Sequence, residues 1–100
     1  MPFKIQIKEE AKADIADAMQ WYATKAENLD TRFVAAVEAT FLKIQRNPFA
    51  FKKVYKKFRQ TAIKSFPYII LYEQEQSNII IYSIFNTWQH LKKKLQRLKR

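Results

Sequence analysis

The stretch FPYIILYEQEQSNIIIYSIF, residues 66–85, determines the fold. Phe66–Tyr72 and Ile79–Phe85 are runs of β-branched and aromatic residues, too short and too apolar to form surface helices, and they predict two strands. The polar segment between them, Glu73–Asn78, predicts a hairpin turn with its two glutamates at a solvated edge. Because the runs are apolar on both faces, both faces of the sheet must be covered.

The residues before this hairpin predict one short strand and two helices. Residues 3–7 alternate apolar and polar side chains, as in a strand with one buried face. Residues 9–22 and 33–44 instead place apolar side chains at helical spacing. We expect Asn28 to cap the second helix and Pro48 to end it, since the residue before a proline avoids the helical region. Two amphipathic helices with a short link predict a helical hairpin lying on the sheet.

Two further segments complete the predicted architecture. Val54–Ile63 alternates and predicts one more strand, and the tail 88–100 predicts a basic helix with leucines on one side. The expected order is βααβββ followed by this helix. We therefore predict a single α+β domain over residues 1–100, with a two-helix hairpin packed on a small, mostly antiparallel sheet. The helices would cover one face, and the other face would need the tail, a second copy or a partner.

The charge is divided very unevenly along the chain. Residues 1–47 carry seven basic and seven acidic side chains and are neutral. Residues 48–100 carry twelve basic and two acidic side chains, so the whole formal net charge of +10 lies in this half. Such an asymmetry indicates that the second half meets something anionic, namely nucleic acid, a membrane surface or an acidic protein.

The chain has neither cysteine nor glycine, which excludes several function classes. Disulfide frameworks and thiolate chemistry need cysteine, and P-loops, Rossmann turns and nucleophile elbows need glycine. Turns should depend on asparagine instead, and four asparagines fall near expected reversals or element ends: Asn28, Asn47, Asn78 and Asn86. No stretch resembles a signal peptide or a membrane span, so we predict a soluble, cytoplasmic protein that does not bind a membrane.

The residues available for binding or chemistry are basic and aromatic. A metal site is not expected, because His90 is the only histidine and the basic half has few carboxylates. The predicted nucleic-acid-binding or target-binding residues are Lys52, Lys53, Tyr55, Lys56, Lys57, Gln89, Lys92, Lys93 and Lys94. A lysine-rich edge strand, charged to prevent aggregation, explains the lysines about equally well. This explanation fits Arg59 less well, because an arginine within a strand can bind phosphate or carboxylate through bidentate hydrogen bonds.

The same residue types permit RNA cleavage without a metal or cofactor. The 2′-hydroxyl of RNA can attack the adjacent phosphate if a protein supplies a general base, a general acid and positive charge. Arg59 and His90 are the tentative catalytic residues of such a reaction, although a lone histidine is more often a surface residue.

The order of elements and several residues together resemble the RelE/ParE superfamily of toxins from bacterial type II toxin–antitoxin systems. The matching pieces cover nearly the whole chain: Ala11, Asp14-Ile15, Trp21-Tyr22, Phe33, Ala36, Ile44, Asn47-Pro48, Arg59, Phe66-Pro67-Tyr68, Ile70, Tyr72 and Ile79–Phe85. The resemblance implies a small toxin that forms a hetero-oligomer with an acidic antitoxin, encoded by an adjacent gene, which blocks its active surface. An acidic segment would complement the basic half of the chain.

The resemblance leaves three functions open. ParE-like inhibition of DNA gyrase is favoured, because Trp21-Tyr22 and Phe66-Pro67-Tyr68 look like that branch. The alternative is a RelE-like, ribosome-dependent endoribonuclease acting on messenger RNA through Arg59 and His90. A basic segment with arginine usually follows the last strand in this superfamily, and this chain reads Asn86-Thr87-Trp88-Gln89-His90 there. The third possibility is a degenerate member that binds without being toxic.

Overall fold

The stretch 66–85 forms the antiparallel pair at the centre of the sheet. In this computed structural model, which describes residues 3–87, β4 (Tyr68–Glu75) pairs with β5 (Asn78–Asn86) along their whole length. The turn contains only two residues, and Gln76 there has a left-handed backbone with φ 56°. The predicted turn over Glu73–Asn78 was therefore too long, because both glutamates belong to β4.

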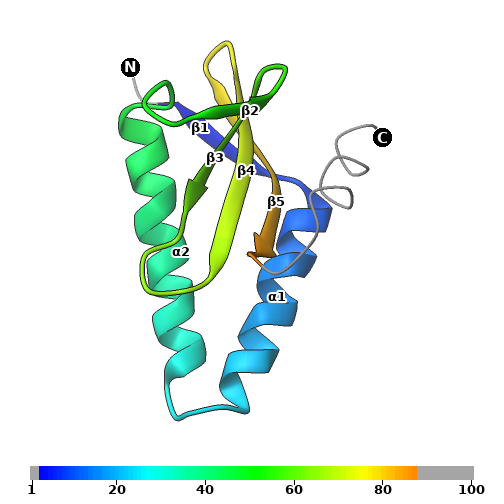
Figure 1. Ribbon diagram of the computed structural model, residues 1–100, viewed down its shortest axis with the longest axis vertical. Helices are drawn as coiled ribbons and strands as arrows, with labels where there is room; N and C mark the ends of the chain where they lie inside the picture. The colour runs from blue at the N-terminus through cyan, green and yellow to red at the C-terminus, as the bar shows by residue number, and fades with distance from the viewer. Residues whose placement is uncertain (1–2, 88–100) are drawn as a thin grey trace.

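Three further strands complete a five-stranded sheet of order β1-β5-β4-β3-β2 (Figure 1). The strand β1 (Lys4–Ile7) runs parallel to β5, and every other neighbouring pair is antiparallel. The two helices, α1 (Glu9–Ala23) and α2 (Leu29–Arg46), form the predicted hairpin and pack on one face of this sheet. The predicted α+β architecture is thus confirmed.

The predicted single strand over Val54–Ile63 is corrected to two strands. They are β2 (Lys53–Tyr55) and β3 (Phe58–Ala62), which pair antiparallel through Lys53 and Arg59. Lys56 takes a left-handed backbone with φ 49° and reverses the chain. The observed order is therefore βααββββ. A lysine at such a turn gives no sequence signal, because glycine and asparagine are the usual residues there.

The ends of α2 lie where the sequence placed them. The N-cap is Asn28, as predicted, but its backbone is left-handed (φ 64°) and its side chain makes no capping hydrogen bond. The helix ends at Arg46, directly before Asn47 and Pro48. The predicted basic helix over 88–100 lies outside the described residues.

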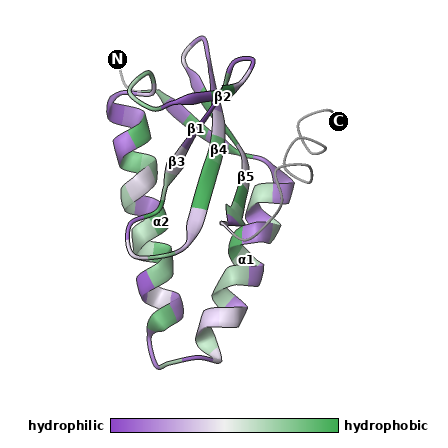
Figure 2. Ribbon diagram, in the orientation of Figure 1, coloured by the Kyte–Doolittle hydropathy of each residue, from purple (hydrophilic) through white to green (hydrophobic). Residues whose placement is uncertain are grey.

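The core lies between the helices and the sheet. It contains the buried residues Ala11, Ala18, Tyr22, Phe33, Val37, Ile44, Ile63, Ile70, Tyr72, Ile79, Ile81 and Ile84. A smaller cluster on the opposite face joins Phe58, Leu71 and Phe85, with Tyr55 and Tyr82 half-buried beside it. In Figure 2 the middle of β4 is hydrophobic, whereas the turns at one end of the sheet are hydrophilic. Apolar side chains therefore occupy both faces, as the strand runs predicted.

A β-bulge explains how β5 contributes to both clusters. Leu71 pairs with Ser83 but Tyr72 pairs with Ile81, so Tyr82 is an extra residue on β5. The extra residue shifts the alternation of side chains, and for that reason both Ile81 and Ile84 point into the main core.

The outer edge of β5 is completed by a side chain of α1. The strand β1 pairs with β5 only as far as Ile81. Beyond that point Asp14 Oδ2 accepts hydrogen bonds from the backbone N–H of Ile84, at 2.9 Å, and from Ser83 Oγ, at 3.2 Å. A backbone donor left unpaired at a partly buried edge costs free energy. Asp14 therefore fixes α1 to the sheet.

Replacing this carboxylate should destabilise the protein. We expect Asp14→Ala to lower the free energy of unfolding by about 2 kcal/mol, since hydrogen bonds to a charged group are lost and a backbone donor loses its partner. Urea denaturation followed by circular dichroism measures the change. The control is Asp17→Ala, which removes the same charge from an exposed position of α1 and should change stability by less than about 0.5 kcal/mol. Equal losses in the two variants would contradict this role of Asp14.

Candidate partner-binding surfaces

The basic hairpin, residues 52–57, collects five of the predicted binding residues on one projection of the molecule. Lys52, Lys53, Lys56 and Lys57 are exposed, and Tyr55 is half-buried. The Tyr55 ring stacks on Phe58, with ring centroids 6.4 Å apart and planes 12° from parallel. Lys56 Nζ lies 5.3 Å from the centroid of the Tyr55 ring. Four cations with an aromatic ring between them suit an anionic partner.

The buried carboxylate of Glu73 supports the basic hairpin. Glu73 is only 2% exposed, which corrects its predicted place at a solvated edge. Its Oε1 accepts a hydrogen bond from the Tyr82 hydroxyl at 2.7 Å, and Lys57 Nζ lies 2.7 Å from Oε2. No donor in residues 3–87 makes a well-aligned hydrogen bond to Oε2, so the ion pair with Lys57 is the interaction that compensates its burial. The contact with Glu73 raises the pKa of Lys57, and burial followed by the bond to Glu73 raises the pKa of Tyr82.

Arg59 lies beside the central hairpin, as predicted, and holds the loop that precedes β2. It pairs with Tyr72 of β4, and its Nη1 donates to the backbone carbonyls of Phe51, at 2.7 Å, and Phe49, at 3.3 Å. The Tyr72 hydroxyl donates to the carbonyl of Pro48 at 2.6 Å. Two side chains of the sheet thus fix the loop between α2 and β2, which places Lys52 and the basic hairpin.

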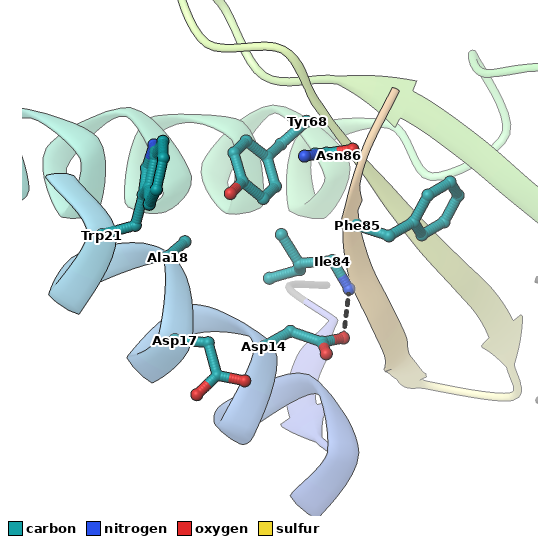
Figure 3. Close-up of a pocket in the computed structure, with 8 residues that line it drawn as sticks. All are labelled: Asp14, Asp17, Ala18, Trp21, Tyr68, Ile84, Phe85 and Asn86. Carbon is teal, nitrogen blue, oxygen red and sulfur yellow. Dashed lines mark hydrogen bonds between the residues drawn. The ribbon is translucent and has the colours of Figure 1, made fainter. Parts of the chain in front are cut away.

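An acidic cleft of about 330 Å³ lies between α1 and the ends of β4 and β5 (Figure 3). The Asp14 carboxylate turns toward β5, and Trp21 and Tyr68 also line the cleft. Trp21 is 56% exposed and carries Lys25 over its ring, with Nζ 3.9 Å from the centroid. Burial raises the pKa of Tyr68, and the charges of Asp14 and Asp17 raise it further. The charged side chains that line this cleft are therefore both acidic, opposite in sign to the lysines of the basic hairpin.

The described part of the chain lacks two other kinds of site. Within residues 3–87 no group of three His, Cys, Asp or Glu side chains is placed to hold a metal ion. Over the same range no helix is both long enough and apolar enough to cross a membrane.

Comparison with known proteins decides the family. Residues 5–97 match the family described as the ParE toxin of type II toxin-antitoxin system, parDE. The chain belongs to the ParE toxin family. This confirms the resemblance to the RelE/ParE superfamily and favours its ParE branch. No curated protein matches the chain.

A solved structure shows that the fold is shared with another ParE system. The chain is similar to a structure titled "Chromosomal ParDE TA system from P. aeruginosa", with a TM-score of 0.74 and 15% sequence identity. The match covers 84% of this chain and 95% of that chain. Membership of a ParE family implies an antitoxin as the partner of this toxin.

The structure brings together some of the predicted binding and catalytic residues and leaves others undescribed. The hairpin lysines, Tyr55 and Arg59 lie close together around β2 and β3. Gln89, His90, Lys92, Lys93 and Lys94 lie outside the described residues. Sequence reasoning missed Glu73 as the support of the hairpin, and it assigned no role to Asp14 or Trp21. The concentration of acidic residues in α1, within a chain of strongly positive net charge, was the signal available for the cleft.

The buried tyrosine that holds the loop predicts alkaline sensitivity. Burial raises the pKa of Tyr72 to about 12 from an ordinary value of 10.0, although the charge of Arg59 lowers it in part. The folded state therefore holds this proton more tightly than the unfolded chain does. The resulting stabilisation is complete below pH 10 and is lost as the pH rises through the folded pKa.

The variant Tyr72→Phe should separate the contribution of the Tyr72 hydroxyl to stability from the contributions of other groups. Without the hydroxyl, the free energy of unfolding should be about 1 kcal/mol lower at neutral pH, because the bond to Pro48 is lost. It should also fall less steeply than in the wild type between about pH 10 and 12. Urea denaturation across this pH range measures both effects. A variant with the slope of the wild type would contradict the assignment.

Proposed function

We propose that this protein is a cytoplasmic toxin that arrests bacterial growth by binding DNA gyrase, and that an acidic antitoxin neutralises it. The observation that carries the proposal is membership of the ParE family over residues 5–97. The basic hairpin supports it further, because its lysines are exposed and its position is fixed by Glu73 and Arg59. A rigid, charged projection suits binding to a macromolecule, since little side-chain and loop order has to be gained on association.

The contacts of Arg59 favour binding over RNA cleavage. A catalytic arginine must direct its guanidinium toward the reacting phosphate. Nη1 of Arg59 instead donates to two backbone carbonyls of the loop before β2. The other tentative catalytic residue, His90, lies outside the described residues. The ribonuclease therefore remains an alternative that the test below must address.

Gyrase inhibition provides the direct test. Purified wild-type protein should inhibit supercoiling of relaxed plasmid by DNA gyrase. The variant Lys52→Gln/Lys53→Gln/Lys56→Gln should need roughly tenfold more protein for the same inhibition, because charges at an interface steer association. The control Lys4→Gln/Lys12→Gln/Lys25→Gln removes the same charge from exposed positions on the other half of the chain and should keep most of the inhibition.

Two outcomes would count against the proposal. Gyrase that stays fully active at a protein dose that arrests living cells would exclude it as the target. Primer extension on messenger RNA in a cell-free translation reaction then tests the alternative. New 5′ ends at ribosome-occupied codons would establish the ribonuclease, and a protein that fails to arrest growth would favour a non-toxic binder.

A further inference from the structure

The acidic cleft between α1 and the ends of β4 and β5 combines aromatic walls with negative charge. Trp21 of α1 and Tyr68, at the start of β4, both line it. In Figure 3 their two rings lie on either side of Ala18. The face of an aromatic ring carries negative potential and attracts cations. The aromatic walls and the carboxylates of this cleft therefore favour the same kind of ligand.

The charge of the cleft comes from two carboxylates of α1. Asp14 and Asp17 both line the cleft and lie on the same side of the helix, since they are three residues apart. Burial raises the pKa of Tyr68 most, and both carboxylates raise it further, so their charges act on the same part of the cleft. Asp17 forms no ion pair within residues 3–87. The described chain also contributes no cationic side chain to the lining.

The Trp21 ring already holds a cation within the protein. Lys25 Nζ lies 3.9 Å from the centroid of this ring, which is close enough for cation–π attraction. Lys25 is not among the residues that line the cleft. The contact therefore shows, independently of the carboxylates, that this wall attracts positive charge.

The opposite wall of the cleft is fixed in place. Asp14 Oδ2 accepts hydrogen bonds from Ile84 N and Ser83 Oγ. The Tyr68 ring packs edge-on against Phe33 of the core, with ring centroids 5.2 Å apart. A site that is formed before the ligand arrives loses little conformational freedom on binding.

The lining selects a guanidinium group over a metal ion or a primary ammonium group. Hard metal ions need many oxygen ligands, whereas two aromatic rings occupy much of this lining. An ammonium group is compact and strongly hydrated. A guanidinium group is planar and weakly hydrated, stacks on aromatic faces and donates two parallel hydrogen bonds to a carboxylate. The volume of about 330 Å³ accommodates this group on a short alkyl chain.

We infer that the acidic cleft binds a guanidinium group carried on a short alkyl chain. The planar cation would stack between Trp21 and Tyr68 and pair with Asp17, while Asp14 adds negative charge from a fixed position. The cleft shares no residue with the basic hairpin, so this inference does not rest on the proposed function.

Two sources can supply the same cation. One is a free guanidino compound, and the other is an arginine side chain. Asn86 lines the cleft, and the sequence that follows it contains Arg97 and Arg100. The shared chemistry is tested first and the source second.

A titration followed by nuclear magnetic resonance tests the chemistry. The ligands are n-butylguanidinium and n-butylammonium, which have the same alkyl chain and the same charge, added at constant ionic strength to the ¹⁵N-labelled full chain. The guanidinium compound should shift the backbone amide signals of the cleft residues until they saturate. The ammonium compound should bind roughly fivefold more weakly, because it cannot stack or form paired hydrogen bonds.

Matched variants locate the binding. Asp17→Asn should weaken the binding of n-butylguanidinium about fivefold, and Trp21→Leu should weaken it about threefold. The control Glu38→Gln removes the same charge from an exposed position of α2 and should change the affinity less than about twofold. Asp17 and Trp21 are also exposed, and circular dichroism checks that all three variants are folded.

The variant Arg97→Gln/Arg100→Gln identifies the source of the cation. If the chain's own arginines occupy the cleft, this variant should bind n-butylguanidinium at least about threefold more tightly than the wild type, because an internal competitor is lost. Equal binding would assign the cleft to a free guanidino compound.

Three results would overturn the inference. The first is the absence of any saturable shift of the cleft amides in both the wild type and the Arg97→Gln/Arg100→Gln variant. The second is equal binding of n-butylguanidinium and n-butylammonium. The third is an equal effect of Asp17→Asn and Glu38→Gln.

Discussion

The pairing of β4 with β5 is the interaction on which the other parts of the structure depend. β5 carries β1 along its other edge, and Asp14 of α1 continues that edge beyond β1. Both helices pack on the face that Ile70, Tyr72 and Ile81 present. A register shift of one residue would reverse the faces of a strand and expose these side chains. The bulge at Tyr82 changes which face the side chains of β5 point to after Ile81, while β5 stays paired with β4. The strand therefore avoids exposing its apolar side chains.

The sequence predicted elements whose signal is local and missed features that depend on contacts across the sheet. The helices, the first strand and the central hairpin follow from apolar spacing, and Asn78 and Asn86 begin and end β5 as expected. The bulge at Tyr82 gives no signal in the sequence, since both residues next to Tyr82 are apolar or small. The burial of Glu73 likewise depends on a contact across the sheet, because Tyr82 of the neighbouring strand donates a hydrogen bond to its carboxylate. A polar residue beside a turn is usually solvated, which made the solvated interpretation reasonable.

Opposite charges lie on different parts of this fold. The helix α1 carries four acidic residues and one lysine, whereas the basic hairpin carries four lysines. Such a division orients an incoming charged partner before contact is made. The buried Glu73 is the exception, because it places a negative charge beneath the positive hairpin. It holds Lys57 in one position and leaves the three other lysines of the hairpin to solvent and partners.

The absence of glycine has a consequence for the entropy of recognition. A typical chain of this length contains about seven glycines, and each loses roughly 0.5–1 kcal/mol more backbone freedom on folding than alanine does. Four left-handed residues, Asn28, Lys56, Ser65 and Gln76, reduce that gain, because each costs about 1 kcal/mol. The two effects nearly cancel in the free energy of folding, but they do not cancel in the stiffness of the backbone. Lys56 at the hairpin tip has fewer backbone conformations than a glycine would have, so the neighbouring lysines have less freedom to lose when a partner binds.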